Sequence, residues 1–320
     1  MSELLHETVL LNEAVAALNI KPEGCYLDAT FGRGGHSQVI LSALGDAGRL
    51  IVVDRDPEAL LIAREWAARD PRIEVRPGSF SEVLADYVRS KTHQYLDGIL
   101  FDLGVSSPQL NQPERGFSFQ HDGPLDMRMN PEEGLSAAEW LARVDEEDLA
   151  NCLYYYGEER FSRRIARAII ARRIERPFET TLDLADCISK AMPRKEHHKH
   201  AATRSFQAIR IKINDEIGEI QRALLDAVRC LSLGGRLSVI SFHSIEDRLV
   251  KQVMRYLVYP ERHQGDDFPD AWIGTELIKW TKPCLQTVGK FIEPGFDESE
   301  RNRRSRSAKL RVAEKTSMVV

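Results

Sequence analysis

The residues best suited to chemistry in this chain are three aspartates, Asp28, Asp54 and Asp102, each of which directly follows a short apolar run. Asp28 precedes a glycine-rich turn, Gly32-Arg33-Gly34-Gly35, after which an apolar helical pattern begins. Because glycine has no Cβ and tolerates φ > 0, such a turn lets the backbone pass close to a ligand. The pattern therefore predicts a ligand-binding site beside the turn, with carboxylates at its border.

The spacing of the glycines indicates which ligand fits. A dinucleotide-binding turn reads G-x-G-x-x-G and holds a pyrophosphate at a helix N-terminus. Here the order is G-x-G-G, and Asp28 lies four residues before Gly32. A carboxylate favours a cationic or hydroxyl-bearing ligand over a phosphate. S-adenosylmethionine carries an ammonium, a sulfonium and a ribose, so it fits, and Asp54 is suited to accept both ribose hydroxyls. A helix N-cap or a turn is the alternative role for Asp54.

These residues require a particular scaffold. Apolar strand patterns alternate with helical patterns, and Asp56-Pro57 opens one of the helices; the strands are expected at residues 25–27, 50–53, 73–75, 96–101 and 236–241. Strands separated by helices of this length form a parallel sheet with right-handed crossovers, and ligands bind beyond the carboxyl ends of its strands. We therefore expect an α/β fold with a mainly parallel sheet.

Asp102 begins a second stretch with chemical character, Asp102-Leu103-Gly104-Val105. Enzymes that methylate an exocyclic amine often carry Asp/Asn-Pro-Pro-aromatic at this point; here only the acid is retained. Asp102 is therefore expected to accept a hydrogen bond from the amine of a base. Phe80, after the third strand, either stacks beside an adenine or belongs to the core. Gln109 either contacts the cofactor or caps a turn.

Between about residues 127 and 203 the strand patterns disappear and only helical patterns remain, which predicts an inserted helical subdomain. Residues 160–176 contain seven arginines, and residues 194–200 form a second basic cluster with three histidines. Arginine binds RNA phosphates, so one wall of an RNA groove is one interpretation and a solvated helix face is the other. The histidines have no accompanying acid or cysteine ligand pattern, so we expect no metal site.

After the insert, an apolar stripe predicts one long amphipathic helix over residues 204–231. His243 follows the fifth strand and is a candidate to accept or relay a proton, while helix capping by Ser244 with Asp247 is equally compatible with the pattern. Residues 276–280 and 308–312 are expected to be two closing antiparallel strands. Between them lies a basic loop that suggests a phosphate-bearing partner, with Arg301, Arg303, Arg304 and Arg306.

The composition describes an ordinary globular protein of 320 residues with a formal net charge of −5, so only local clusters can bind nucleic acid. The five cysteines are scattered and form no C-x-x-C, which favours free thiols in a reducing compartment. Met1 to Glu7 have no basic-then-apolar pattern, and no apolar run is long enough to cross a bilayer. We therefore expect a cytoplasmic protein without a membrane segment.

Several runs together resemble the RsmH (MraW) family, in order along essentially the whole chain. They are Thr30–Ser37, Asp102–Ser107, Arg115–Phe119, Gly123–Met129, Ala202–Ile211 and Ser241–Arg248. The resemblance implies a class I S-adenosylmethionine-dependent methyltransferase that modifies the N4 of a cytidine in 16S ribosomal RNA, at the decoding region of the small subunit. The chain differs in having Asn302-Arg303-Arg304 where the family usually has Asn-Pro-Arg, and Ser79 where an asparagine is common.

The resemblance also implies a domain layout and a site. The expected layout is a methyltransferase core over residues 1–126 and 204–320, with a helical substrate-recognition domain over 127–203. The implied cofactor contacts are Gly34, Gly35, His36, Asp54, Phe80, Asp102 and Gln109. Asp102 and His243 are the expected catalytic residues, the partner is 16S ribosomal RNA or the small subunit, and a homodimer is left open. A nucleotide-dependent oxidoreductase and a non-catalytic ribosome-assembly factor are the alternative functions.

Overall fold

The computed structural model describes residues 8–90, 94–193, 200–263 and 276–318. The chain divides into two compact units. The larger unit combines Met1–Gly104 with Ile217–Val320, and the smaller unit is Val105–Glu216. The smaller unit contains all of the expected insert, residues 127–203, and extends beyond it at both ends.

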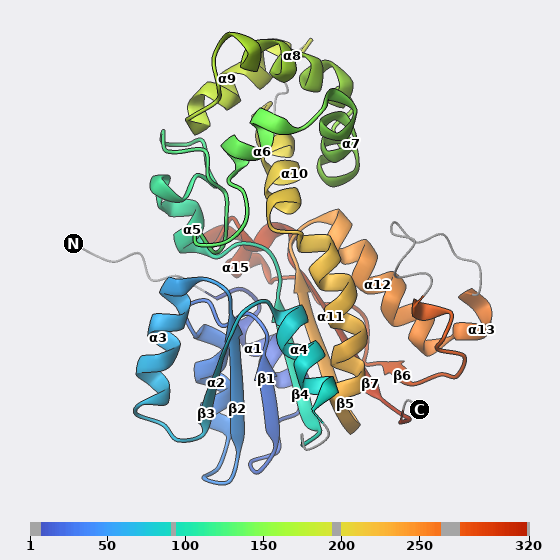
Figure 1. Ribbon diagram of the computed structural model, residues 1–320. Helices are drawn as coiled ribbons and strands as arrows, with labels where there is room; N and C mark the ends of the chain where they lie inside the picture. Colours follow the sequence, from blue (N-terminus) through green and yellow to red (C-terminus); the bar gives the residue numbers. More distant parts are fainter. Residues whose placement is uncertain (1–7, 91–93, 194–199, 264–275, 319–320) are drawn as a thin grey trace. The chain divides into compact units, whose positions relative to one another are not determined.

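A seven-stranded sheet forms the centre of the larger unit (Figure 1). Its order is β3-β2-β1-β4-β5-β7-β6; β1 to β5 are parallel, and β7 pairs antiparallel with both β5 and β6. The strands are β1 (Cys25–Asp28), β2 (Arg49–Asp54), β3 (Ile73–Pro77), β4 (Leu96–Asp102), β5 (Leu231–Ser241), β6 (Leu285–Thr287) and β7 (Lys309–Lys315). This is the predicted class I methyltransferase architecture, so the predicted fold class is confirmed.

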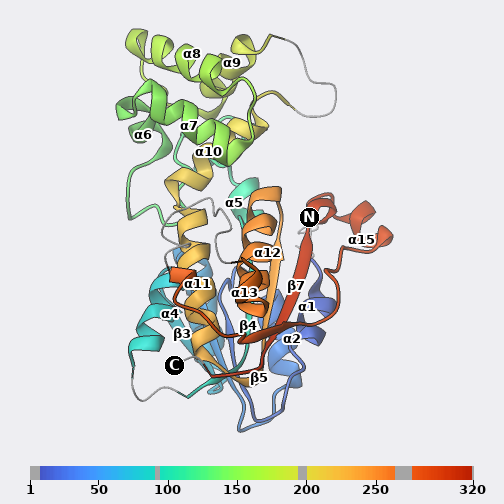
Figure 2. The same ribbon diagram turned by 90° about the vertical axis from the view of Figure 1, so that its right-hand side faces the viewer.

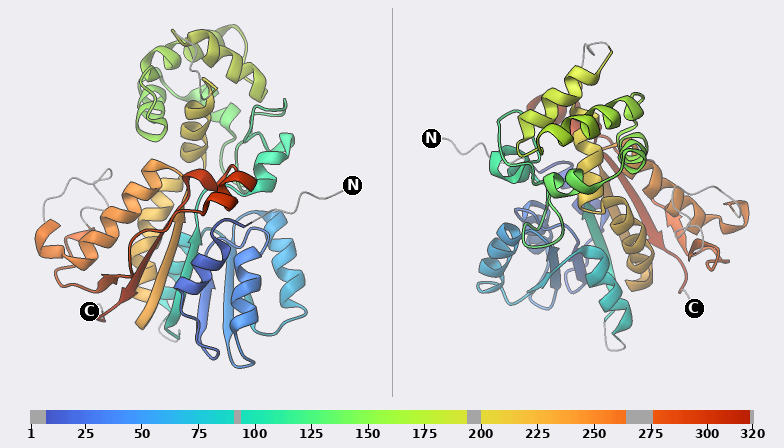
Figure 3. Two further views of the ribbon diagram at one scale, coloured as in Figure 1. Left: turned by 180° about the vertical axis from the view of Figure 1, so that it is seen from behind. Right: turned by 45° about the horizontal axis from the view of Figure 1, so that its top comes forward.

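Helices cover both faces of this sheet (Figures 1 and 3). One face carries α1, α2 and α3, and the other carries α4, α11 and α12. The helices of this unit are α1 (Leu11–Ala17), α2 (Gly35–Ala43), α3 (Pro57–Ala67), α4 (Phe80–Arg89), α11 (Glu216–Cys230), α12 (Ser244–Val258), α13 (Pro260–His263) and α15 (Phe296–Arg301), with a 3₁₀ turn η2 (Ser305–Ser307). Buried apolar residues of α1 to α3 pack against β2 and β5 in one core cluster. No helix in the described part of the chain is long and apolar enough to span a membrane.

The strand order decides where a ligand can bind. From β1 the chain adds β2 and then β3 on one side, and after returning it adds β4 and β5 on the other side. At such a switch point the loops beyond the carboxyl ends of neighbouring strands diverge and leave a crevice. Asp28 ends β1, Asp54 ends β2 and Asp102 ends β4. All three aspartates therefore lie at the edge of the sheet where the fold leaves room for a ligand.

The smaller unit is helical. It contains α5 (Ser107–Asn111), η1 (Pro113–Arg115), α6 (Ala137–Arg143), α7 (Glu146–Gly157), α8 (Ser162–Glu175), α9 (Thr181–Ala191) and α10 (Thr203–Ile213). Its own apolar core includes Leu141, Leu153, Ile165, Leu184 and Phe206. Ser136 caps α6 in a capping box with Glu139, as its sequence predicts.

Two predicted elements are wrong. The long helix expected over residues 204–231 is interrupted, because Asp215 has φ +47° between α10 and α11. The apolar stripe is nevertheless buried on both sides of the break, at Ile209 and from Ile217 to Val228, and Ile213 beside the break is partly buried. Residues 276–280 form no strand: Glu276 and Leu277 are helical, and a turn follows. Leu277 and Trp280 are buried three residues apart, which is the spacing of a helical turn.

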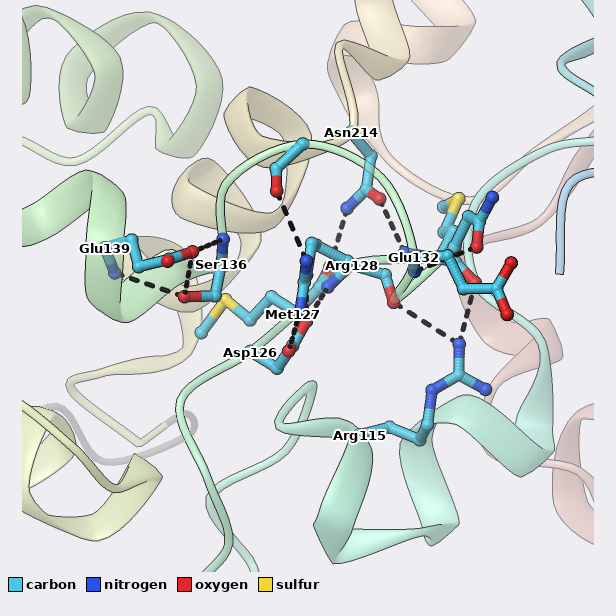
Figure 4. A network of polar contacts seen from close by, with 11 residues as sticks. Arg115, Asp126, Met127, Arg128, Glu132, Ser136, Glu139 and Asn214 are labelled. Atoms are coloured by element: carbon cyan, nitrogen blue, oxygen red, sulfur yellow. Dashed lines mark hydrogen bonds and ion pairs between the residues drawn. The ribbon is translucent and has the colours of Figure 1, made fainter. Parts of the chain in front are cut away.

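The break in the helix has a structural use in the smaller unit (Figure 4). The Asn214 side chain donates from Nδ2 to the Met127 carbonyl at 2.8 Å, and its Oδ1 accepts from the Met129 amide at 2.8 Å. Arg115 donates to the Met129 carbonyl at 2.8 Å. Met127 has φ +64°, a conformation that costs a residue other than glycine free energy. Asn214 and Arg115 therefore hold the strained loop of residues 127–129.

Candidate active site

Asp28 supports the glycine turn from inside the protein. Its side chain is 1% exposed, and its two oxygens accept hydrogen bonds from the Ser37 hydroxyl at 2.7 Å and the Thr30 amide at 3.1 Å. Burial raises the pKa of Asp28 to about 6, although both hydrogen bonds oppose that shift. With both oxygens engaged inside the protein, Asp28 shapes the turn and is not exposed to a ligand.

The glycines of the turn are required by packing inside the protein. Gly34 has φ +80°, and a Cβ there would lie 2.6 Å from the Trp66 ring. A Cβ at Gly35 would lie 1.9 Å from Thr8 Oγ1. Around Gly32, with φ +55°, the nearest atom to an added Cβ is the Thr30 carbonyl at 3.9 Å. The turn is thus closely packed at Gly34 and Gly35 and open at Gly32.

Asp54 ties the end of β2 to the turn. Its Oδ2 accepts from the Gly32 amide at 2.8 Å and its Oδ1 from the Asp56 amide at 2.9 Å. The N-cap of α3 is Asp56, whose side chain accepts from the Glu58 amide at 3.1 Å. Burial raises the pKa of Asp54. The Arg55 amide also contributes a hydrogen bond, so of the about four acceptor positions of a carboxylate Asp54 retains one for a ligand hydroxyl.

Asp102 carries an acceptor atom that no protein group uses. Its Oδ1 is buried and has no hydrogen-bond partner among the residues that the structure describes. Its Oδ2 lies 3.7 Å from His36 Nδ1, and its amide donates to Thr30 Oγ1 at 2.7 Å. Burial, then the charges of Asp28 and Glu246, raise the pKa of Asp102 well above its ordinary value. A buried acceptor without a donor is costly for the fold, and this arrangement is typical of a binding or catalytic site.

His36 lies directly after the glycines and is 4% exposed. Its Nε2 lies 3.2 Å from the Val9 carbonyl, on the opposite side of the ring from Asp102. If Nε2 donates to that carbonyl, Nδ1 faces the Asp102 carboxylate without a proton, and a protonated ring would donate to both. His36 therefore links the segment before α1 to the end of β4.

His243 is the N-cap of α12, a role that the sequence had offered to Ser244. His243 Nδ1 accepts from the Glu246 amide at 3.4 Å, and the Glu246 carboxylate accepts from the amides of Phe242 at 2.8 Å and His243 at 3.3 Å. Because Nδ1 is the acceptor, the proton of the neutral ring is on Nε2, 3.0 Å from Glu246 Oε1. Glu246 is fully buried and acts on the pKa of Asp102, a role that its position three residues after His243 did not reveal.

Phe80 and Gln109 begin helices in different units. Phe80 is the first residue of α4, after the N-cap Ser79, and its partly exposed ring meets Phe101 edge-on at 5.5 Å. Gln109 lies in the smaller unit, where it forms a capping box with Ser106 at the start of α5. Capping therefore accounts for the burial of Gln109, and its predicted contact with a cofactor stays a prediction.

The seven arginines of residues 160–176 differ in their contacts. Arg167 forms an ion pair with Glu146 at 3.5 Å and Arg176 one with Asp183 at 3.3 Å. Three others connect helices of the smaller unit: Arg164 donates to the Ala191 carbonyl, Arg172 to Asp183, and Arg173 to the carbonyls of Leu141 and Val144. Arg160 and Arg163 are exposed and have no partner within the described ranges. Arg172 and Arg173 are only partly exposed, so these two are engaged within the unit, while the RNA and solvated-face interpretations both stay open for the exposed arginines.

The other basic cluster is only partly described. Residues 194–199 lie outside the described residues, and His200, the last residue of that cluster, packs its ring against Phe119 at 4.6 Å. The C-terminal basic residues Arg301, Arg303, Arg304 and Arg306 are all exposed.

Comparison with known proteins gives three kinds of match. A model of the MraW methylase family matches residues 3–316. The ribosomal RNA small subunit methyltransferase H of Hydrogenovibrio crunogenus is 53% identical over 311 residues, which cover 97% of this chain and 96% of the relative. Among solved structures, a putative rRNA-methylase from Clostridium thermocellum has a TM-score of 0.44 at 10% identity, covering 98% of this chain and 100% of that one. A putative methyltransferase from Streptococcus mutans in complex with SAH has a TM-score of 0.42 at 10% identity, covering 97% and 99%.

Proposed function

This chain belongs to the MraW methylase family, and from that premise we propose that it methylates the N4 amine of a cytidine in 16S ribosomal RNA. The proposed target lies in the decoding region of the small subunit, and the proposed compartment is the cytoplasm. The 53% identical relative, a ribosomal RNA small subunit methyltransferase, supports the substrate class. The observation that carries the chemistry is the unused, buried Oδ1 of Asp102 at the carboxyl end of β4.

The cofactor is S-adenosylmethionine, the methyl donor of this methylase family and the ligand predicted from the glycine turn. The turn fits it: the backbone is open at Gly32, and Asp54 has acceptor capacity left for the ribose. Phe80 is proposed to lie beside the adenine, and Gly34, Gly35, His36 and Gln109 are proposed to complete the site. The bound cofactor supplies an electrophilic methyl group on a sulfonium.

Asp102 is proposed to orient the amine. The lone pair of an exocyclic amine is delocalised into the ring, so the nitrogen attacks well only when an acceptor holds its N–H groups in a fixed direction. Among the described residues no donor binds Asp102 Oδ1, and a raised pKa makes its carboxylate a stronger base. Asp102 is therefore suited both to hold the amine and to take the proton that methylation releases.

His243 is the other proposed acceptor of that proton, and its surroundings make it the weaker one. Its Nδ1 lone pair accepts the capping hydrogen bond of α12, so a proton on Nδ1 would break the cap. Asparagine is among the best N-cap residues but cannot take up a proton. His243→Asn is thus expected to keep kcat within about threefold, whereas proton transfer by His243 would be worth on the order of 10²-fold. A fall of about 10²-fold in kcat, with the stability of the variant unchanged, would show that His243 accepts the proton.

A base in a duplex hides its amine, so the target cytidine is proposed to enter the site unpaired or flipped out. The smaller unit is proposed to recognise the RNA, with residues 127–203 as the recognition domain. Arg160 and Arg163 are its candidates for phosphate contacts, since both are exposed and neither has a partner in the described part of the chain.

The deciding experiment measures transfer of a labelled methyl group to unmodified 16S RNA and to small subunits that lack the modification, followed by mass spectrometry of the nucleosides. We expect N4-methylcytidine from the wild type and a loss of at least about 10²-fold in kcat for Asp102→Asn. Calorimetry with the cofactor keeps a binding defect apart from a catalytic one. A product other than N4-methylcytidine would contradict the substrate atom, and absence of any transfer would favour a non-catalytic assembly factor. Tight binding of a nicotinamide cofactor would favour an oxidoreductase.

A further inference from the structure

The C-terminal segment of residues 290–311 returns to the catalytic edge of the sheet. β7 runs antiparallel to β5, so its first residue, Lys309, pairs with Ser241 at the carboxyl end of β5. On the neighbouring strand, Asp102 pairs with Ile240. The residues directly before β7 therefore lie at the same edge as the aspartates. Figures 2 and 3 show the red segment with α15 at this edge of the larger unit.

Specific contacts join this segment to the site. The Glu298 side chain in α15 accepts from the Leu10 amide at 2.9 Å. The preceding residue, Val9, has its carbonyl 3.2 Å from His36 Nε2, and His36 Nδ1 lies 3.7 Å from Asp102. A continuous series of contacts thus connects α15 to the proposed catalytic carboxylate within the larger unit.

The segment exposes both cations and aromatic rings. Residues 290–311 contain seven lysines and arginines against four acids, in a chain with a net charge of −5. Two of the acids are engaged, Glu298 with Leu10 and Glu300 with Arg306. Phe296, at the start of α15, is 80% exposed, and Arg303 is exposed and has no partner among the described residues. Single exposed apolar residues are common on protein surfaces, so Phe296 alone would indicate nothing.

A second aromatic ring in the segment is already bound by cations. Phe291 is 45% exposed, and Lys309 and Arg311 each lie 5.3 Å from its ring centre. Asp247 holds Arg311 through two hydrogen bonds at 2.6 and 3.0 Å. Burial alone would raise the pKa of Asp247, but the hydrogen bonds and charge of Arg311, together with the charges of Lys309 and Lys251, lower it. The Phe291 cluster is therefore internally satisfied, whereas Phe296 and Arg303 are exposed and available to a partner.

Exposed aromatic rings beside arginines are the means by which proteins bind single-stranded nucleic acid, since every base has a face that stacks and every nucleotide has a phosphate. We infer that residues 296–303 bind the unpaired RNA next to the target nucleotide, with Phe296 stacking on one base and Arg303 contacting a phosphate. The inference rests on the proposed function, because it takes the RNA as substrate of the neighbouring site. It assigns RNA contacts to the larger unit itself, in addition to the helical unit.

The test measures the equilibrium affinity of the full-length protein for unmodified 16S RNA at several salt concentrations. Phe296→Leu keeps an apolar side chain but cannot stack, and we expect affinity to fall about 10-fold, as for one lost base–aromatic contact. Phe296→Trp is expected to bind as tightly as the wild type. Arg303→Gln is expected to lower the slope of log affinity against log salt by about 0.7, the value for one single-strand phosphate contact.

Arg69→Gln is the matched control. Arg69 is also exposed, and its substitution by glutamine removes one positive charge, as Arg303→Gln does. It lies between α3 and β3, at the opposite edge of the sheet. The Arg69→Gln variant is expected to bind RNA with the affinity and the salt slope of the wild type. The inference is overturned if Phe296→Leu binds RNA like the wild type, or if Arg69→Gln changes the slope as much as Arg303→Gln. A protein partner or a second copy as the true occupant would give that first result.

Methyl transfer separates this inference from the proposed function. The Phe296 and Arg303 variants are expected to raise KM for RNA and to leave kcat and cofactor binding unchanged. A wild type that binds RNA through Phe296 but transfers no methyl group would contradict the proposed function alone. If the wild type methylates RNA and Phe296→Leu has the same KM for RNA as the wild type, only the inference is contradicted.

Discussion

Asp102 at the end of β4 is partly exposed, and the charges of two buried carboxylates, Asp28 and Glu246, act on it. Burial is the largest cause of the raised pKa of Asp28 and Asp102, and the charges of neighbouring acids add to it. Grouping acids in this way lowers the stability of the folded state, and it also provides a carboxylate that binds a proton more tightly than usual. At the scale of residues, the site therefore lowers the stability of the fold and provides a more basic carboxylate.

The pH dependence of stability tests this for Asp28. Its folded pKa, about 6, lies above the ordinary value of 3.8, so its contribution is fully stabilising below pH 3.8 and is lost as the pH rises through 6. At about 1.4 kcal/mol per pKa unit, the stability of the wild type relative to Asp28→Asn should fall by about 2 kcal/mol between pH 4 and pH 7. Urea unfolding of both proteins across this range measures it. A constant difference would mean that Asp28 titrates normally.

Gly34 and Gly289 form a matched pair for the cost of a crowded turn. Both have positive φ, +80° and +70°, but an added Cβ meets the Trp66 ring at Gly34 and nothing within 4 Å at Gly289. Gly289→Ala should cost only the backbone strain of about 1 kcal/mol. Gly34→Ala should cost about 2 kcal/mol more through overpacking and should weaken cofactor binding at least about 10-fold. Thermal unfolding measures the stability of both variants, and calorimetry measures cofactor binding. Equal losses of stability would show that the Trp66 ring can move aside at no cost in free energy.

At the scale of elements, the break between α10 and α11 makes Asn214 available to the strained loop of residues 127–129. A continuous helix would keep an asparagine side chain at this position on the helix surface. With Asp215 in a left-handed conformation, the helix ends and the Asn214 amide reaches both the Met127 carbonyl and the Met129 amide. The interruption therefore stabilises a loop that lies far from it in the sequence.

Asn214→Ala tests the value of that contact. It leaves the buried Met127 carbonyl and the partly buried Met129 amide of a strained loop without this partner, so we expect a loss of about 2 kcal/mol and faster hydrogen exchange at the Met129 amide. Asn130→Ala is the control in the same loop, where Oδ1 accepts one hydrogen bond from the Glu132 amide and the site is partly exposed. It should cost less than about 1 kcal/mol. Equal protection of Met129 in both variants would mean that Arg115 alone holds the loop.

How much of this could be predicted depends on the element. β1, β2 and β4 were recognised within two residues because each is an apolar run that ends in an aspartate. The break at Asp215 was missed because the apolar stripe continues through it and no proline or glycine marks it. β6 has one buried residue, Leu285, so its sequence carries no alternating apolar pattern. The apolar residues Leu277 and Trp280 instead led to the wrong prediction of a strand over residues 276–280.

The site was predicted to a similar extent. The positions of the aspartates at strand ends could be predicted, because the order of strands and helices is visible in the local sequence pattern and fixes the edge of the sheet where they lie. The unused Asp102 Oδ1, the burial of Glu246 and the contact between Leu10 and Glu298 depend on side-chain directions and long-range packing. No pattern in one sequence carries that information.

At the scale of the whole molecule, the thiols are distributed through both units and none is in a disulfide. Burial raises the pKa of Cys25 to about 11 and those of Cys152, Cys230 and Cys284 to about 12, while Cys187 is partly exposed. Since the thiolate is the reactive form, a thiol reagent at pH 7.5 should modify Cys187 slowly and the other four only on unfolding. Reaction of all five after denaturation is the internal reference, and a fast native reaction of two or more thiols would contradict this burial.

The pairing of Asp102 with Ile240 also governs how the molecule is assembled. The smaller unit is one continuous stretch of chain, so it can collapse through short-range encounters. The larger unit must close a loop that spans that entire stretch before β4 and β5 meet, and it must wait for residue 298 before Leu10 gains its partner. Such distant encounters carry a high entropic cost and slow the rate-limiting step. The site at the strand ends is consequently expected to be among the last parts of the protein to acquire its native form.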